Sequence, residues 1–357
     1  LFRMVPLQTE DFLVARSDEL DTMREAVARW EKNRPSALAL VGEVGTGKTT
    51  LINCATPKLF SKYEVYRHAF DGTVNTEADL TRIMCVLLGI KKTISMDELA
   101  QYFMARETPC VILLEHGYEL FMRRIGGLEV IGALLQLIST TSRKVFWCLS
   151  MTESAWRYLD AVVEISEYFS YVIETRNLSG DELAQVIMAR HEVSGYGLLF
   201  ASENTPSVMR RLKKTGDEKA QQNVLRDIFF ERLADASKGN VQIALFYWLR
   251  SIIEIKDDTV YVELLKPFRF AFLNQLNVDK LFTLAAVLQQ GTLTVREHME
   301  VFRSSEAVSE GMMATLASDN LIQIRPGVDE GGDVRYMINP VMRRPLVDLL
   351  WNRHIFY

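Results

Sequence analysis

The chain has 357 residues, a formal net charge of −5, 48% hydrophobic residues and 24% charged residues. This is the composition of an ordinary folded protein, and it excludes intrinsic disorder, collagen-like repeats and a disulfide scaffold. The length predicts two or three domains, each with its own core. The mild acidity argues against nucleic acid as an automatic partner, since such a partner normally selects a basic surface.

The cysteines and the apolar stretches indicate where such a chain would reside. We expect buried, reduced thiols in a cytoplasmic protein, because the four cysteines lie far apart in apolar surroundings and form no C-x-x-C motif. The most apolar stretches, 125–138 and 241–255, are too short and too often interrupted by polar residues to cross a bilayer. The chain begins at Leu1 with no signal peptide, so we expect it to be part of a larger protein.

The first predicted domain, residues 1–178, alternates short apolar runs with amphipathic stretches. Helices are predicted at 18–31, at 96–106 after a capping box of Ser95 and Glu98, and at 127–139. The predicted strands are 37–42, 63–70, 110–115, 144–150 and 171–175. This alternation predicts right-handed βαβ units, and therefore an α/β three-layer αβα domain with a parallel sheet.

The second predicted domain, residues 179–267, reads as a helical lid. A capping box of Ser179 and Glu182 opens it, and a helix over 240–255 closes it. The polar stretch 204–219 between them is predicted to be a loop.

The third predicted domain, residues 268–357, has the element order of a winged helix. Helices are predicted at 278–290, 295–302 and 306–317, with Thr294 and Glu297 forming a capping box for the second. Strands 321–325 and 334–338 flank a turn-rich segment and should pair as a hairpin. Three helices followed by a hairpin, two of them joined as a helix-turn-helix, is typical of a winged helix.

The strongest motif is a complete G-x-x-x-x-G-K-T that follows a predicted strand and precedes a predicted helix. Its residues are Gly42, Glu43, Val44, Gly45, Thr46, Gly47, Lys48 and Thr49. The glycines let backbone N–H groups point at phosphate oxygens, and the helix N-terminus adds positive potential. We therefore predict ATP with Mg²⁺: Lys48 reaches the β- and γ-phosphates, Thr49 binds the metal, and the neighbouring Thr50 joins the nucleotide site.

A P-loop ATPase also needs an acidic group at the end of a neighbouring strand. The strand 110–114 ends at Glu115-His116, where an acidic pair is usual, so Glu115 is predicted to hold Mg²⁺ directly or through water. His116 would polarise the attacking water less well than a carboxylate, although it could act as a base. The alternative is that His116 only caps the strand and bonds a neighbouring carbonyl. Fast hydrolysis is not expected in either case.

The segment ahead of the P-loop carries a resemblance to a family. Phe12-Leu13-Val14-Ala15-Arg16-Ser17-Asp18-Glu19-Leu20 is similar to the box that precedes the P-loop in AAA+ initiator-type ATPases and STAND NTPases. Those proteins have an ASCE-type P-loop domain followed by a helical lid and often a winged helix. The resemblance extends over nearly the whole chain in the order of its elements.

The resemblance implies roles for further residues. Ser150, with Thr152 near it, looks like the polar sensor of the γ-phosphate at the end of the fourth strand. The adenine pocket would be formed by Leu13, Val14 and Arg16, and closed from the lid by Leu183 and Ile187.

Two features depart from the family pattern. Where initiators carry a sensor arginine and STAND proteins a G-x-P motif, this chain has Gly239-Asn240-Val241-Gln242. No Arg or Lys occurs between Tyr158 and Thr175, the region that normally supplies the trans-acting arginine, and Arg157 and Arg176 flank the gap as poor substitutes. We therefore expect an ATP-dependent switch and not a processive ring motor.

The predicted winged helix has an unfavourable charge for reading DNA. Its third helix, within 305–319, carries Glu306, Glu310 and Asp319 and no Lys or Arg. Phosphates would be repelled by the surface that ought to approach them, which favours a protein-contacting or self-docking role. A contact of the wing alone with DNA, through Arg325 and Arg335, is the alternative.

The function predicted from the sequence is an ATP-binding regulatory switch module of STAND/AAA+ type with slow or impaired hydrolysis. It would control the conformation or oligomerisation of a larger assembly, through self-association or contacts with other domains or subunits. The rival prediction is a nucleic-acid-handling AAA+ ATPase, an initiator or transposition-type loader. A third prediction is a scaffold that is stabilised by the bound nucleotide and never hydrolyses it.

Overall fold

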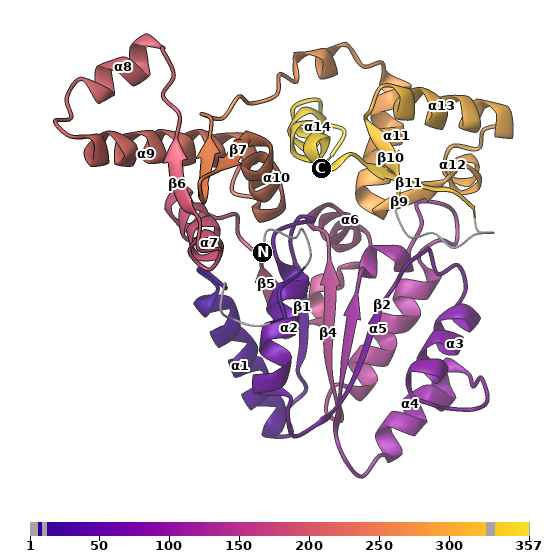
Figure 1. Cartoon of the computed structure of the whole chain (residues 1–357). Coiled ribbons are helices and arrows are strands. Elements are labelled where there is room, and N and C mark those ends of the chain that lie inside the picture. The colour runs from indigo at the N-terminus through magenta and orange to yellow at the C-terminus, as the bar shows by residue number, and fades with distance from the viewer. Residues whose placement is uncertain (1–5, 9–12, 326–332, 357) are drawn as a thin grey trace. The chain divides into compact units, whose positions relative to one another are not determined.

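The computed structural model describes residues 6–8, 13–325 and 333–356 (Figure 1). Phe12 and residues 326–332 of the predicted hairpin turn therefore lie outside the described residues. By its internal contacts the chain forms two compact units. The first comprises Leu1–Asp18, Val44–Cys54 and Arg176–Arg269, and the second comprises Glu19–Glu43, Ala55–Thr175 and Phe270–Tyr357. The three-domain division at 178 and 267 stays a prediction.

The second unit is built on a five-stranded sheet in the order β2-β3-β4-β1-β5, in which every pair of neighbours is parallel. Every residue of β1, β3 and β4 is buried. Continuous apolar runs form these central strands because a parallel sheet is covered on both faces. The five predicted strands are confirmed as β1 (Ala37–Val41), β2 (Glu64–Ala69), β3 (Cys110–Glu115), β4 (Val145–Met151) and β5 (Tyr171–Glu174).

Helices cover both faces of this sheet. On one face Trp147 packs against Phe103 of α4, with ring centroids 5.7 Å apart, and Figure 1 shows α3, α4 and α5 beside the strands. On the other face Phe146 contacts Trp30 of α1 at 5.7 Å and Phe60 at 5.4 Å. The helices are α1 (Ser17–Glu31), α2 (Lys48–Leu59), α3 (Glu77–Leu87), α4 (Met96–Ala105), α5 (Glu129–Thr141) and α6 (Glu153–Val163). The predicted three-layer αβα fold is confirmed, and so is the capping box of α4. The sequence did not assign α3 and α6.

The C-terminal part of the second unit has the element order of a winged helix. Ile322 pairs with Ile338 in the antiparallel hairpin that the sequence predicted. The structure adds a third strand, β9, beside β11, and a final helix that closes the core. The elements are α11 (Val278–Gln290), β9 (Thr292–Thr294), α12 (Val295–Phe302), α13 (Glu306–Ser318), β10 (Ile322–Ile324), β11 (Arg335–Ile338) and α14 (Pro340–Asn352).

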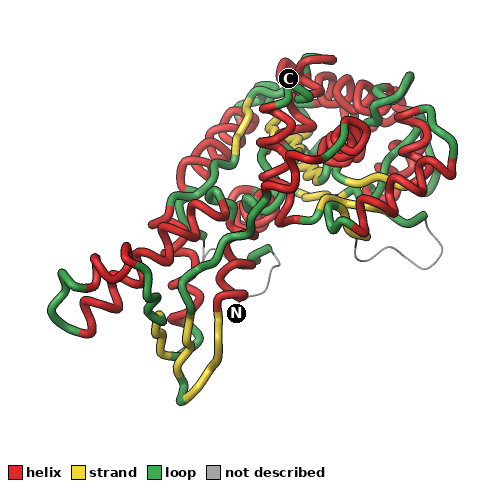
Figure 2. The backbone as a smooth tube through the Cα atoms, turned by 90° about the horizontal axis from the view of Figure 1, so that it is seen from above, coloured by secondary structure: helices red, strands yellow, loops and turns green. Residues whose placement is uncertain are grey.

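The first unit contains the P-loop from Val44 onward and a helical domain with a small sheet of its own. Its elements are α7 (Gly180–Glu192), β6 (Gly197–Phe200), α8 (Pro206–Leu212), α9 (Glu218–Ser237), α10 (Val241–Ser251), β7 (Ile252–Lys256) and β8 (Thr259–Val262). The sheet has the order β6-β8-β7, and Figure 2 shows the β7–β8 hairpin in yellow. The capping box of Ser179 and Glu182 is confirmed at the start of α7.

Two sequence predictions for this unit are wrong. The stretch 204–219 is not all loop, because α8 begins with Pro206, a residue that suits the first turn of a helix. The helix predicted over 240–255 ends at Ser251, and the residues after it form β7, which pairs with β8. β-branched residues dominate the run Ile252-Ile253-Glu254-Ile255, and tertiary pairing gives them a strand instead of another helical turn.

The cysteines and the hydropathy agree with the sequence. Cys54, Cys85, Cys110 and Cys148 are all buried and free, as predicted. Over the described parts of the chain, no helix combines the length and the apolar character that crossing a bilayer requires.

Candidate functional site

The P-loop connects the end of β1 to the start of α2, which begins at Lys48. The N–H of Gly42 donates to the carbonyl of Met151 at 3.2 Å and fixes the start of the loop against β4. Gly45 and Gly47 have φ values of 88° and 98°, a backbone conformation that favours glycine. A Cβ added at Gly47 would meet nothing within 4 Å. An open, left-handed glycine directly before a helix N-terminus fits a cradle for phosphate.

The start of α10 contacts the P-loop at Val44 and Gly45. Asn240 donates through Nδ2 to the carbonyl of Val44 at 2.9 Å, and the N–H of Gln242 donates to the carbonyl of Gly45 at 3.3 Å. The Asn240 Oδ1 accepts from the N–H groups of Gln242 and Ile243, and so caps α10. The segment where the sequence departs from both family patterns is therefore held against the P-loop by neutral amides.

Gly45 has no room for a side chain. A Cβ there would lie 2.6 Å from the Cβ of Gln242 and 2.7 Å from the Oδ1 of Asn240. We expect Gly45→Ala to lower the free energy of unfolding by about 3 kcal/mol, because the strain of a positive φ adds to overpacking. Gly47→Ala is the matched control, since it carries the strain alone and should cost about 1–2 kcal/mol. Urea unfolding without nucleotide measures both, and equal losses would contradict the close contact.

Arg16 connects three segments of the first unit. Its buried guanidinium donates through Nη2 to the carbonyls of Thr46 and Arg176, both at 2.9 Å. These bonds fix the P-loop relative to the segment that leads into α7. The predicted role of Arg16 in an adenine pocket stays a prediction.

The other predicted adenine contacts belong to the core of the same unit. Leu183 and Ile187 are fully buried, and Val14 packs against the cluster that contains them, while Leu13 is half-buried. The structure thus brings Val14 together with the two lid residues. Thr50, next to the P-loop, accepts a hydrogen bond from the N–H of Leu7 at 3.2 Å.

Glu115, the predicted metal ligand in the second unit, is paired with an arginine that the sequence did not indicate. It is 2% exposed at the end of β3, and Arg67 of β2 donates to its Oε1 from Nη2 at 2.5 Å and from Nε at 2.8 Å. A guanidinium that holds a carboxylate with two N–H groups forms a strong charge-assisted contact. Arg67 therefore competes with any cation that would bind Glu115.

His116 adopts a left-handed conformation, with φ 61° and ψ 42°, immediately after β3. Its Nδ1 lies 2.9 Å from the carbonyl of Phe70, and its ring stacks on Tyr118 at 5.5 Å. Since a carbonyl only accepts, the ring carries its proton on Nδ1. This is the contact described by the alternative interpretation of His116, in which it bonds a neighbouring carbonyl.

Ser150 and Thr152 lie at the carboxyl end of β4, which is parallel to β3. Leu114 pairs with Leu149 in the β3–β4 register, so Glu115 and Ser150 each directly follow a residue of that pair. Ser150 is buried within β4, and Thr152 caps α6 by accepting from the N–H of Ala155 at 3.4 Å. The sensor role of Ser150 stays a prediction, and Thr152 acts as a helix cap.

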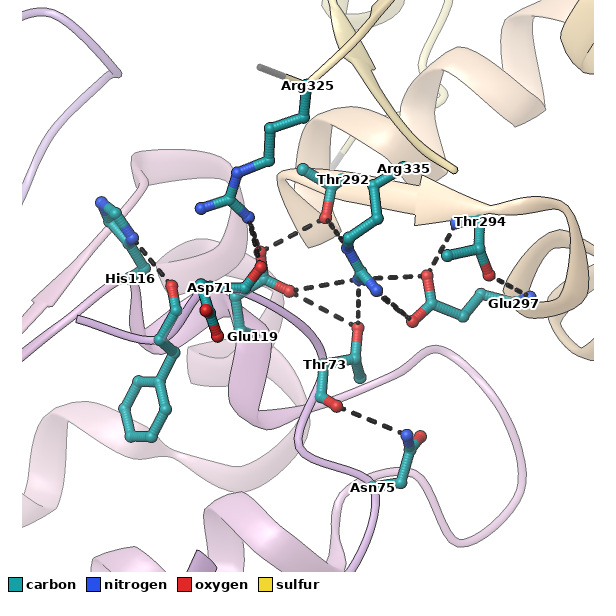
Figure 3. Close-up of polar contacts among 11 residues, drawn as sticks. Asp71, Thr73, Asn75, His116, Glu119, Thr292, Thr294, Glu297, Arg325 and Arg335 are labelled. Atoms are coloured by element: carbon teal, nitrogen blue, oxygen red, sulfur yellow. Dashed lines mark hydrogen bonds and ion pairs between the residues drawn. The ribbon is translucent and has the colours of Figure 1, made fainter. Parts of the chain in front are cut away.

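Glu119, three residues after His116, holds a buried polar network (Figure 3). It lies in the short 3-10 helix η2 (Gly117–Leu120) and is fully buried. Arg325 approaches its Oε1 at 3.3 Å, and Arg335 approaches its Oε2 at 3.5 Å. Arg335 also pairs with Glu297 at 3.0 Å. Burial raises the pKa of Glu119 to about 7, against the opposing effect of the two arginines.

The two wing arginines are thus engaged inside the second unit. Arg325 donates to the carbonyl of Asp71 at 2.8 Å, and Arg335 donates to Thr73 Oγ1 at 2.8 Å. Next to them the ring of Tyr118 lies against the backbone of Gly291, where a Cβ would come within 2.2 Å of the ring. The segment after His116 therefore contacts the winged-helix part through both charge and shape.

The two arginines that flank the missing trans-acting residue have local partners. Arg157 pairs with Glu153 at 2.6 Å within α6. Arg176 pairs with Glu182 of the α7 capping box at 2.5 Å. These contacts agree with the expectation that neither residue replaces a trans-acting arginine well.

No protein-family model matches the chain, and no curated protein sequence matches it either. Solved structures resemble it over most of its length. The Orc1 protein of Aeropyrum pernix, solved in complex with DNA, has 14% sequence identity and a TM-score of 0.46 over 95% of this chain and 94% of its own. Cdc6p of Pyrobaculum aerophilum has 14% identity and a TM-score of 0.44 over the same shares. A Walker-type ATPase of Pyrococcus abyssi has 12% identity and a TM-score of 0.41 over 97% and 99%. Each is a distant likeness of fold alone.

Proposed function

We propose that the chain is an ATP-binding regulatory switch with slow hydrolysis, which controls the conformation or oligomerisation of a larger assembly. The P-loop residues 42–50 hold the nucleotide in this proposal, and Lys48 contacts its β- and γ-phosphates. Among the described residues no group of three or more His, Cys, Asp or Glu side chains could hold a metal ion. Mg²⁺ bound to a nucleotide takes phosphate oxygens and water and needs few protein ligands. Thr49 and Glu115 keep the metal-binding roles that the sequence suggested.

Slow hydrolysis is supported by the state of Glu115 and His116. The Glu115 carboxylate is held by Arg67, which weakens its pull on a cation. His116 uses Nδ1 on the carbonyl of Phe70, which takes that nitrogen away from an attacking water. A neutral imidazole polarises the attacking water less well than a carboxylate does.

The switch is carried by one observation: Glu119, three residues after His116, is paired with two arginines of the winged-helix part. If a metal-bound nucleotide drew Glu115 away from Arg67, η2 would shift with it. Because Glu119 is fully buried, it could not follow without disturbing Arg325 and Arg335. The charge change at the site would thus bias the position of the winged-helix part.

Single-turnover ATP hydrolysis tests the slow-hydrolysis half of this proposal. We expect wild type to hydrolyse ATP more slowly than about 1 s⁻¹, the lower end of ordinary turnover numbers. Arg67→Met should raise the rate about tenfold, because it frees Glu115 for the metal. Arg82→Met, which removes an exposed arginine paired with Asp79, is the control and should leave the rate unchanged. Fast hydrolysis by wild type, or no gain from Arg67→Met, would contradict the proposal.

The rival, a nucleic-acid-handling ATPase, would need a basic surface on the winged-helix part. α13 contains Glu306 and Glu310 and no Lys or Arg, and Arg325 and Arg335 are held by buried carboxylates. We therefore expect duplex DNA to bind no more tightly than about 10⁻⁶ M at about 0.15 M salt, the range of non-specific binding. A gel shift with and without ATP measures this. Tight, salt-sensitive binding would favour the rival.

A further inference from the structure

A cavity of about 360 Å³ lies within the second unit, among α6, the end of α11 and α14. Its size is that of a small-molecule site. All its lining residues belong to one compact unit, and they include the P-loop residue Glu43 but no other residue of the P-loop.

Four arginines line this cavity, and three of them have partners. Arg344 pairs with Glu43 at 2.7 Å and with Asp348 at 3.0 Å. The other two are Arg157, bonded to Glu153 at 2.6 Å, and Arg123, which donates to the Oε1 of Gln289 at 2.6 Å.

Arg343 is the exception. It is 8% exposed, yet within the described parts of the chain no hydrogen bond or ion pair engages its guanidinium. Burial lowers the pKa of Arg343, which reflects the cost of desolvating its charge. The carboxylate whose charge acts on Arg343 is that of Glu43, and it is bound to Arg344. A buried guanidinium without a partner is costly for a fold to keep, and an anion that entered the cavity would relieve that cost.

The rest of the wall is mainly apolar. Leu288, Val347, Trp351, Ile355 and Phe356 also line the cavity, with the Arg157 guanidinium 5.0 Å from the centre of the Trp351 ring, and Tyr158 and Ala161 contribute from α6. An inorganic ion would leave these surfaces without contacts. A cavity with one unpaired cation and an apolar wall fits a ligand that has both an anionic group and a hydrocarbon or aromatic body.

We propose that this cavity is a binding site for a small organic anion whose carboxylate or phosphate pairs with Arg343 and whose apolar body packs on Trp351, Val347 and Phe356. The cavity shares only Glu43 with the P-loop residues. Because the cavity is enclosed by α6 and α14, its ligand would stabilise the contact of the sheet with the winged-helix part.

Isothermal titration of the full chain with 3-phenylpropionate and with phenyl phosphate tests this inference. We expect at least one of the two anions to bind saturably, and the uncharged 3-phenylpropionamide to bind at least tenfold more weakly. Arg343→Met, which keeps the volume and removes the charge, should weaken the anion at least tenfold. Arg296→Met, which removes an exposed arginine of the same unit outside the cavity, is the matched control and should bind as wild type does.

Two further variants keep the test decisive if Arg343→Met alters folding. Ala161→Trp places a large side chain at an exposed position that lines the cavity and should abolish binding of the anion. Lys48→Ala should bind it within twofold of wild type, because Lys48 does not line the cavity. No saturable binding of either anion, equal binding of the amide, unaltered binding to Ala161→Trp, or a tenfold loss in Lys48→Ala would overturn the proposal.

Discussion

Replacing Lys48 with alanine is expected to weaken ATP binding about 100-fold and to abolish the response of the winged-helix part to nucleotide. The substitution removes the ammonium group that the motif directs at the β- and γ-phosphates. Charge-assisted hydrogen bonds are worth about 1.5–3 kcal/mol each, and about 3 kcal/mol corresponds to a factor of roughly 100 in affinity. The helix N-terminus and the glycines remain, so the P-loop itself should keep its conformation.

The measurement combines ATP titration with hydrogen exchange at η2, β10 and β11. In wild type, ATP should change the exchange of these segments, because Glu119, Arg325 and Arg335 connect them. Lys91→Ala, which removes an exposed lysine in the turn before α4, is the control. If Lys48→Ala abolished binding yet left every conformational and oligomeric property unchanged, the switch would be refuted.

Arg335→Met is expected to lower the free energy of unfolding by about 3 kcal/mol at pH 8. Its side chain is 13% exposed, and its guanidinium lies near two carboxylates, Glu119 and Glu297. Removing one partner of a buried ion pair leaves an uncompensated charge, which typically costs 3–5 kcal/mol. Arg296→Met is the control: its side chain is 80% exposed and 3.8 Å from Glu300, so its loss should cost less than about 1 kcal/mol.

The pH dependence of this loss identifies Glu119 as the responsible partner. The pKa of Glu119 is raised to about 7 in the fold, from an ordinary value of 4.5. A carboxyl group whose pKa is raised by folding stabilises the folded state at pH values below its pKa in the unfolded chain. That contribution is lost as the pH rises to about 7. At pH 5.5 Glu119 is protonated in the folded state, so removing Arg335 leaves no unpaired charge on it. The free energy of unfolding lost in Arg335→Met should therefore be about 1 kcal/mol smaller than at pH 8.

Urea unfolding at pH 5.5 and pH 8 measures the difference. A loss in Arg335→Met no larger than that in Arg296→Met at pH 8 would show that the network contributes nothing to stability. A loss that is the same at both pH values would assign the effect to Glu297 instead of Glu119.

The local features of the fold could be predicted from the sequence alone. The capping boxes that begin α4, α7 and α12 join residues three positions apart, and the structure has all three. α11 and α12 have the predicted bounds, and the central strands β1, β3 and β4 follow from continuous apolar runs. The short strands β6 and β7 could not be predicted, because runs with only three large apolar residues each fit a helix end equally well.

The P-loop could be identified without the structure, since that motif consists of consecutive residues between a strand and a helix. What the predicted site residues contact emerges only in the folded chain. Arg67 meets Glu115 from 48 residues away, Asn240 meets the P-loop from 196 residues away, and Arg325 meets Glu119 from 206 residues away. The strand pattern around Arg67 predicts only a half-exposed position, and nothing near Glu119 indicates that it is fully buried. Ion pairs and burial of this kind depend on how distant elements pack, and spacing along the chain does not encode them.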